Sequence, residues 1–213
     1  MEFSRFSKTI VKIKNLPLPG EASHFKMEPA VRKQFREEST IDVKKAKRAA
    51  VMALFYPKEN NETHLLLMLR NTYPGVHSNQ IGFPGGKVED TDSDLLVTAK
   101  RETFEEVGIL PEDIEMVKPL TEVYIPPSNF LVKPFLGLYS QVKPFKLDPM
   151  EVEALVEVKL VDFLDNDNLM QQYLTTSYAH KILVPAFKLN GYTVWGATAM
   201  MLSEIKDLLQ KVV

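Results

Sequence analysis

An unbroken apolar run from Ala49 to Tyr56 constrains the fold of this 213-residue chain more than any other feature. The run is far too short for a membrane-spanning helix, which needs about 20 residues. It is instead typical of a strand that is buried on both faces of a sheet. A second apolar run, His64 to Arg70, follows a polar turn at 57–62, so the two runs predict a hairpin inside a covered sheet.

The remaining elements alternate irregularly between helix and strand. Apolar spacing predicts short helices at 3–15 and 30–38, a helix at about 94–107 and a C-terminal helix at 197–209. Strands are expected near 80–83, 115–124, 131–139 and 153–160, partial helix at 161–173, and a hairpin at 183–194 around Asn190-Gly191. This order favours an α/β fold of the α+β kind, with helices packed on a mixed sheet. We treat residues 1–45 as an N-terminal helical extension and 46–213 as the main domain.

Composition excludes several classes of function. The chain has no cysteine, which removes disulfides, thiolate metal sites and cysteine nucleophiles and fits a reducing compartment. The net charge of −2 gives no basic excess for nucleic acid. No apolar run is long enough to span a membrane, and the N-terminal residues do not have the pattern of a secretory signal. We therefore expect a cytoplasmic protein. Its N-terminal helix could pack on the main domain or on a second copy of the chain in a homodimer.

The helix expected at 94–107 carries an unusual group of charges. Glu102, Glu105 and Glu106 stand at positions i, i+3 and i+4, so they share one patch beside the apolar stripe. Three carboxylates so placed repel one another, at roughly 0.2–0.5 kcal/mol per pair. They also lie near the helix C-terminus, where the helix dipole disfavours negative charge. The simplest interpretation is a charged helix face that is exposed to solvent. A bound Mg²⁺ or Mn²⁺ would relieve both the repulsion between the carboxylates and their unfavourable interaction with the helix dipole.

Residues around the triplet could complete a metal site. Arg101 falls beside Glu105 on the helix and could hold that carboxylate in position. Upstream, Gly85-Gly86 lets the backbone approach a ligand closely, and a backbone carbonyl there could add another metal ligand. The segment thus offers carboxylates, a cation and a place for an anionic substrate.

The stretch from Gly86 to Ile109 resembles the Nudix box of the Nudix hydrolases, most closely in Arg101-Glu102-Thr103-Phe104-Glu105-Glu106-Val107-Gly108-Ile109. It departs from the family pattern in a gap one residue longer, in Asp92 where the family has Glu, and in Thr103 at an apolar position. The longer gap and the Asp are similar to the coenzyme A pyrophosphatase branch. The same holds for His77-Ser78-Asn79-Gln80-Ile81-Gly82-Phe83-Pro84-Gly85-Gly86 before the box and for Trp195-Gly196-Ala197-Thr198-Ala199.

The resemblance implies a Nudix-like α/β/α sandwich with a mixed sheet and a catalytic helix that follows the Gly-Gly loop. It implies Mg²⁺ or Mn²⁺ as cofactor, with Glu102, Glu105, Glu106 and the Gly86 carbonyl as metal ligands. The catalytic assignments are Glu151 as the preferred general base, Glu102 as the second candidate, and Arg101.

Substrate contacts are also expected from the resemblance. His77 and Gln80 are candidate substrate-binding residues. The coenzyme A branch usually has Arg where this chain has Gly75, and Gly where it has Asn79. If that Arg grips a phosphate, Arg70 or Lys87 would have to supply the cation here.

Three functions follow from the resemblance. The first is hydrolysis of the diphosphate of coenzyme A or acyl-coenzyme A to 3′,5′-ADP and (acyl-)4′-phosphopantetheine. The second is the same chemistry on another nucleoside diphosphate derivative, such as ADP-ribose, a nucleotide sugar, a dinucleotide or an oxidised nucleotide. The third is a nucleotide-sensing domain without activity, which the complete set of box glutamates disfavours. The partner in each case is a small molecule.

Overall fold

The computed structural model describes residues 1–33, 45–71, 80–175 and 181–213. Its helices are α1 Phe3–Ile10, α2 Glu21–His24, α4 Leu95–Val107, α5 Leu160–Leu164 and α6 Gly196–Leu209, with 3₁₀ turns η1 Val11–Asn15, η2 Phe25–Met27, η4 Pro111–Asp113 and η5 Pro126–Ser128. Its strands are β1 Lys47–Pro57, β2 Thr63–Arg70, β3 Ile81–Gly82, β4 Gly85–Lys87, β5 Ile114–Pro119, β6 Val123–Ile125, β7 Phe130–Tyr139, β8 Val152–Lys159, β9 Leu169–Leu174, β10 Ile182–Leu189 and β11 Tyr192–Trp195.

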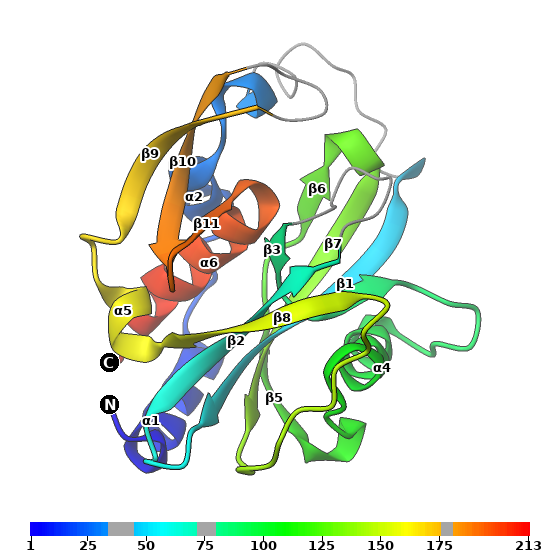
Figure 1. Ribbon diagram of the computed structural model, residues 1–213, viewed down its shortest axis with the longest axis vertical. Coiled ribbons are helices and arrows are strands. Elements are labelled where there is room, and N and C mark those ends of the chain that lie inside the picture. Colours follow the sequence, from blue (N-terminus) through cyan, green and yellow to red (C-terminus); the bar gives the residue numbers. More distant parts are fainter. Residues whose placement is uncertain (34–44, 72–79, 176–180) are drawn as a thin grey trace.

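Strand β1 lies at the centre of the main sheet (Figure 1). It pairs with β2 in antiparallel fashion, with Leu54 opposite Leu66, and with β7 in parallel, with Ala49 opposite Val132. β3 and β8 pair with β2, β5 and β6 pair with β7, and β4 pairs with β1. The sheet is therefore mixed, as predicted, and the expected hairpin of the two apolar runs is its core.

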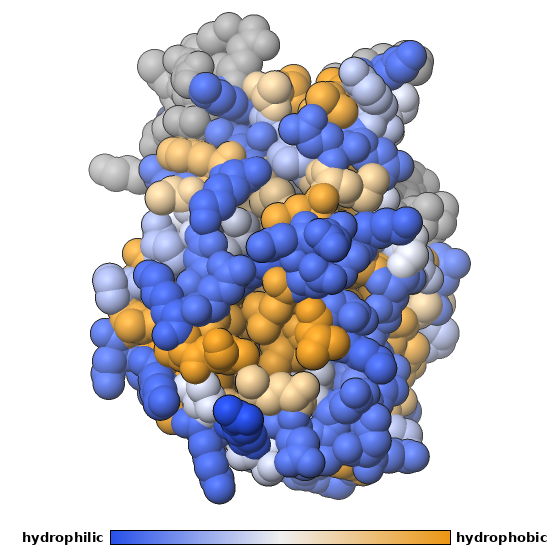
Figure 2. Space-filling view, turned by 90° about the vertical axis from the view of Figure 1, so that its left-hand side faces the viewer, coloured by the Kyte–Doolittle hydropathy of each residue, from blue (hydrophilic) through white to orange (hydrophobic). Residues whose placement is uncertain are grey.

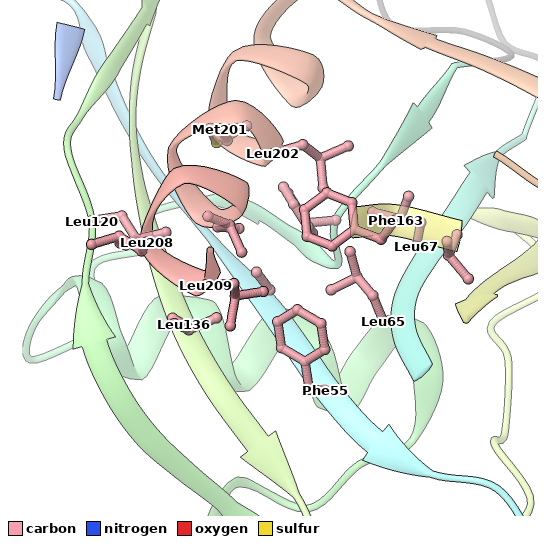
Figure 3. Close-up of a cluster of buried hydrophobic side chains, with 14 of the residues drawn as sticks. Phe55, Leu65, Leu67, Leu120, Leu136, Phe163, Met201, Leu202, Leu208 and Leu209 are labelled. Atoms are coloured by element: carbon pink, nitrogen blue, oxygen red, sulfur yellow. The ribbon is translucent and has the colours of Figure 1, made fainter. Parts of the chain in front are cut away.

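The alternating residues of β1 enter two separate hydrophobic clusters. Ala53 and Phe55 belong to the cluster that includes residues of α1 and α6, whereas Met52 and Leu54 belong to the cluster that includes residues of α4. Helices thus cover both faces of the sheet (Figure 1), which confirms the predicted sandwich. Figure 3 shows leucines of α6 packed toward Phe55 and Phe163. Burial on both faces explains why β1 is apolar without a break.

The N-terminal segment packs on the main sheet. The predicted helix at 3–15 is present as α1, which continues into η1. Phe3, Phe6, Ile10 and Ile13 are all buried in the cluster that contains α6. Of the helix predicted at 30–38, residues 30–33 are helical and the rest lies outside the described residues. The division of the chain at residue 45 stays a prediction.

The C-terminal half holds one element that the sequence did not predict. The partial helix predicted at 161–173 is present as α5, which ends at Leu164, but β9, which follows it, was not predicted. β9 pairs with β10, and β10 with β11, in a second, three-stranded sheet. The predicted turn at Asn190-Gly191 is present, and both residues have positive φ, at 49° and 83°.

Figure 2 views the molecule from the side that carries β9 and α5. Apolar surface lies there between charged side chains, and the exposed large apolar residues of these elements and of β10 include Val161, Leu169, Tyr173 and Leu183. Among the helices that the structure describes, none is both long and apolar enough to cross a membrane.

Candidate active site

Helix α4 is capped at both ends. The Asp94 carboxylate accepts hydrogen bonds from the N–H groups of Leu96 and Val97, at 2.8 and 2.9 Å, which caps the first turn. Gly108 ends the helix in the left-handed region, with φ of 77°. The predicted boundaries of this helix are therefore correct to within one residue.

Strand β4 brings the two adjacent glycines against the glutamates of α4. The Gly85 N–H donates a 2.7 Å hydrogen bond to Glu106 Oε2. Gly86 lies so close to Glu102 that an added Cβ would sit 2.5 Å from its carboxylate. Gly85 has φ of 148°, and a Cβ there would collide with the backbone of Ala50 and Val51. Gly85 thus requires glycine, and a side chain at position 86 would displace the Glu102 carboxylate. The close approach of this backbone to a ligand stays a prediction.

Three carboxylates converge beside these glycines. Glu102, Glu106 and Glu151 each present an oxygen within 4.8 Å of the others; we call them the carboxylate cluster. Glu106 is 1% exposed, whereas the side chain of Glu151, which directly precedes β8, is 51% exposed. The cluster therefore runs from the protein interior to solvent. This is the arrangement that an oxygen-binding divalent cation requires if it must also reach a substrate.

Arg70, at the end of β2, enters the same site. Its Nη2 lies 3.1 Å from Glu106 Oε1 and 3.7 Å from Glu151 Oε2, and its Nη1 donates to the Gly85 carbonyl at 3.3 Å. Arg70 was predicted as a substrate contact, and the structure places it at the carboxylate cluster. It thus already pairs with the protein's own carboxylates.

The electrostatics of the carboxylate cluster favour a cation. Burial raises the pKa of Glu106 to about 8, although the Arg70 guanidinium and the Gly85 N–H oppose this rise. Burial also raises the pKa of Glu102, against the effect of Arg101. Glu106 Oε1 is buried, and among the described residues no aligned hydrogen-bond donor reaches it, although Arg70 Nη2 lies 3.1 Å away. A hard divalent cation would satisfy this oxygen and hold both carboxylates charged, so the residues present fit a metal ion.

Arg101 organises the outer side of the cluster. Its Nε and Nη2 bind the two oxygens of Asp92 at 2.9 Å each, and its Nη1 lies 3.1 Å from Glu102 and 2.8 Å from Glu105. The guanidinium holds the pKa of Asp92 well below its usual range. The predicted Arg101–Glu105 pair is present. Its pairing with Asp92 was not predicted, because the two are nine positions apart across a loop.

Glu105 does not join the carboxylate cluster. Its side chain is 51% exposed and pairs with Arg101. Glu151, from the turn before β8, stands in the group instead. The roles of Gly86, Glu102, Glu105 and Glu106 as metal ligands stay predictions.

Of the remaining predicted substrate contacts, two lie in the described part of the chain and one does not. Gln80 and Lys87 line a cavity of about 620 Å³ that also reaches Arg70, Gly85 and Gly86. The cavity therefore reaches the residues that contact the carboxylate cluster, although Glu102, Glu106 and Glu151 do not themselves line it. His77 lies outside the described residues.

Comparison with known proteins gives the family. Residues 46–176 match the model of the NUDIX domain. The chain is 30% identical over 164 residues to "Nudix hydrolase 15, mitochondrial" of Arabidopsis thaliana, a match that covers 74% of this chain and 57% of that protein. It is 30% identical over 171 residues to the "Uncharacterized Nudix hydrolase NudL" of Enterobacter sp. (strain 638), covering 80% and 86% of the two chains. The match thus spans little more than half of the Arabidopsis relative.

Solved structures agree on the fold. A Nudix hydrolase from M. smegmatis, RenU, superposes with a TM-score of 0.53 at 13% identity, covering 79% of this chain and 88% of that one. A MutT/nudix family protein from Enterococcus faecalis superposes with a TM-score of 0.51 at 13% identity, covering 92% and 76%. At such identities the likeness shows the fold alone. With the family match over residues 46–176, it follows that the chain belongs to the Nudix family.

Proposed function

We propose that this protein is a divalent-metal-dependent hydrolase of nucleoside diphosphate derivatives, with coenzyme A or its acyl derivatives as substrate. The observation that carries the proposal is the carboxylate cluster, whose buried Glu106 Oε1 has no aligned hydrogen-bond donor among the described residues, next to Arg70, Gly85 and Gly86, which line a large cavity. Membership in a family whose relatives are named hydrolases supports it.

In this proposal Glu102 and Glu106 hold Mg²⁺ or Mn²⁺, with the Gly86 carbonyl and Glu105 as further candidate ligands. A bound divalent cation supplies charge neutralisation for the diphosphate and makes a water molecule more acidic. Gly85 fixes Glu106 through its N–H, and Arg101 restrains Glu102. The protein's part is to keep these oxygens close together in spite of their mutual repulsion.

Glu151 is the proposed general base. It belongs to the carboxylate cluster, yet half of its side chain is exposed, so it can accept a proton from water and release it to solvent. Glu102, which is more enclosed, is the second candidate.

Coenzyme A is the proposed substrate because of the residues before the box. Gln80, Phe83 and Pro84 belong to the stretch that resembles the coenzyme A branch, and Gln80 lines the cavity beside the cluster. Lys87 and Arg70 are the candidate cations for phosphate groups, since both line the same cavity. Other nucleoside diphosphate derivatives remain the alternative substrates.

A hydrolysis screen tests the proposal. Coenzyme A, ADP-ribose and a dinucleotide are incubated with the full chain, with and without Mg²⁺, and products are identified by mass. We expect 3′,5′-ADP and 4′-phosphopantetheine from coenzyme A only when metal is present. Cleavage of ADP-ribose alone would move the substrate to the alternative class, and no cleavage of any compound would contradict the proposal.

A further inference from the structure

The cavity at the carboxylate cluster is larger than a diphosphate requires. Its volume of about 620 Å³ lies in the range of pockets that enclose a whole small molecule. Arg70, Gly85 and Gly86 line it on the side of the carboxylate cluster. The cavity therefore has room for a group attached to the diphosphate.

The far side of the cavity is mainly apolar. Val31 comes from the N-terminal segment, Ile125 from the end of β6, Phe130 from β7, and Ala197 and Met201 from α6. We call these five residues the apolar wall. No acidic residue lines the cavity in the part of the chain that the structure describes, and its basic residues are Arg32, Arg70 and Lys87. Such a lining suits an anion that carries an uncharged, weakly polar group.

Parts of the apolar wall come from outside the region that defines the family. Val31 precedes the matched residues 46–176, and Ala197 and Met201 follow them. Selectivity encoded there lies outside the family match, although Ala197 belongs to the stretch that resembles the coenzyme A branch.

A buried polar network joins these two ends of the chain. Glu204 of α6, which is 0% exposed, accepts a hydrogen bond from the Gly20 N–H at 3.1 Å and lies 3.4 Å from His24 Nε2. Ser23 also donates to Asp207 of α6, and Arg32 donates to the Tyr124 carbonyl next to β6 residue Ile125. The N-terminal segment is therefore held against α6 and β6, where it can contribute to one rigid wall.

We propose that the apolar wall is a specificity pocket for the uncharged arm of the diphosphate substrate, and that Val31 and Ala197 are specificity-determining residues. This inference rests on the proposed function. For a coenzyme A substrate, the pantetheine arm occupies the cavity, because it carries no charge and presents methyl and methylene groups. A ribose arm would leave its hydroxyls against apolar side chains.

The test compares dephospho-coenzyme A with ADP-ribose. Both contain adenosine 5′-diphosphate without a 3′-phosphate, and they differ in the second arm. We expect kcat/KM to favour dephospho-coenzyme A by at least tenfold, which is the effect of burying about two methylene groups. The variants Val31→Asp and Ala197→Asp should each reduce this preference at least fivefold, mostly through KM. Val161→Asp, an exposed position on α5 that does not line the cavity, is the matched control and should leave the preference unchanged.

The outcomes separate the inference from the function. Hydrolysis of coenzyme A with equal kcat/KM for the two test substrates, or with a preference that both wall variants retain, would overturn the inference and leave the function standing. Hydrolysis of no diphosphate would overturn both. Thermal unfolding is followed for each variant. Val31 and Ala197 are both partly exposed, so either variant tests the inference if the other fails to fold.

Discussion

The Glu102 carboxylate lies directly against the Cα atom of Gly86, where there is no space for a side chain. We therefore expect Gly86→Ala to displace Glu102 from the carboxylate cluster and to lower kcat by at least 100-fold, with a higher Mg²⁺ requirement. A Cβ at Gly82 would meet no atom within 4 Å. Gly82→Ala is therefore the control, and it should keep at least ten times more activity than Gly86→Ala. Equal activity of the two variants would show that the contact does not position Glu102.

The two hydrogen bonds between Arg101 and Asp92 need a planar guanidinium. Lysine carries a single ammonium group and cannot bind both Asp92 oxygens while it also reaches Glu102. Arg101→Lys should lower kcat by roughly 10- to 100-fold and raise the Mg²⁺ concentration for half-maximal activity. Arg48→Lys, where the arginine pairs with Glu122, should change neither. An unchanged Mg²⁺ dependence in Arg101→Lys would contradict a positioning role.

The helix prediction succeeded because its signals are local. The apolar spacing of α4, the Asp94 cap and the Gly108 stop all lie within one segment, and each acts through neighbouring residues. The hairpin at Asn190-Gly191 is a similar case. β9 was not predicted, since it alternates exposed and half-buried residues along the edge of a small sheet. Pairing with β10 decides its conformation, and that pairing is not a property of residues 169–174.

The candidate site was also predictable only where its arrangement depends on neighbouring residues. The helical positions of Glu102 and Glu106 placed both on one patch, and this is correct. The near-complete burial of Glu106 was not predictable, because it arises from Gly85 and Arg70, which arrive from β4 and β2. The same positions grouped Glu105 with Glu106, yet Arg101 pairs with Glu105 and half of that side chain is exposed.

Removal of the general base should change the pH dependence of turnover. We expect Glu151→Gln to lower kcat by roughly 10²- to 10⁴-fold and to abolish the acidic limb of the kcat profile. Glu153→Gln, two positions along the chain on β8, exposed and outside the carboxylate cluster, is the matched control and should retain the wild-type profile. If the acidic limb persists in Glu151→Gln, the base is another group, with Glu102 the next candidate.

The Glu204 network should contribute stability that depends on pH. Burial would raise the pKa of Glu204, but hydrogen bonds with His24 and Thr121 outweigh this effect and hold it below its usual range. A carboxyl whose pKa is lowered by folding stabilises the protein above the pKa of the unfolded chain, about 4.3, and loses this contribution as pH falls through the folded value.

Glu204→Gln should therefore lower the free energy of unfolding by roughly 1–3 kcal/mol at pH 7, because N–H groups lose an acceptor. The difference from wild type should shrink as the pH falls below about 4. Urea denaturation at several pH values measures this. Glu115→Gln, at an exposed ion pair with Lys14, is the control and should cost little. A difference that is constant with pH would contradict the assignment.

Titration of the metal-free protein with Mn²⁺, followed by electron paramagnetic resonance, tests the metal site most directly. Glu106→Gln can keep the hydrogen bond from the Gly85 N–H but loses the charge. We expect wild type to bind Mn²⁺ at the carboxylate cluster, Glu106→Gln to bind it at least tenfold more weakly, and Glu153→Gln to match wild type. Glu105→Gln should weaken binding less than Glu106→Gln does. Wild-type Mn²⁺ affinity in a folded Glu106→Gln protein would contradict a metal site built on Glu102, Glu106 and Glu151.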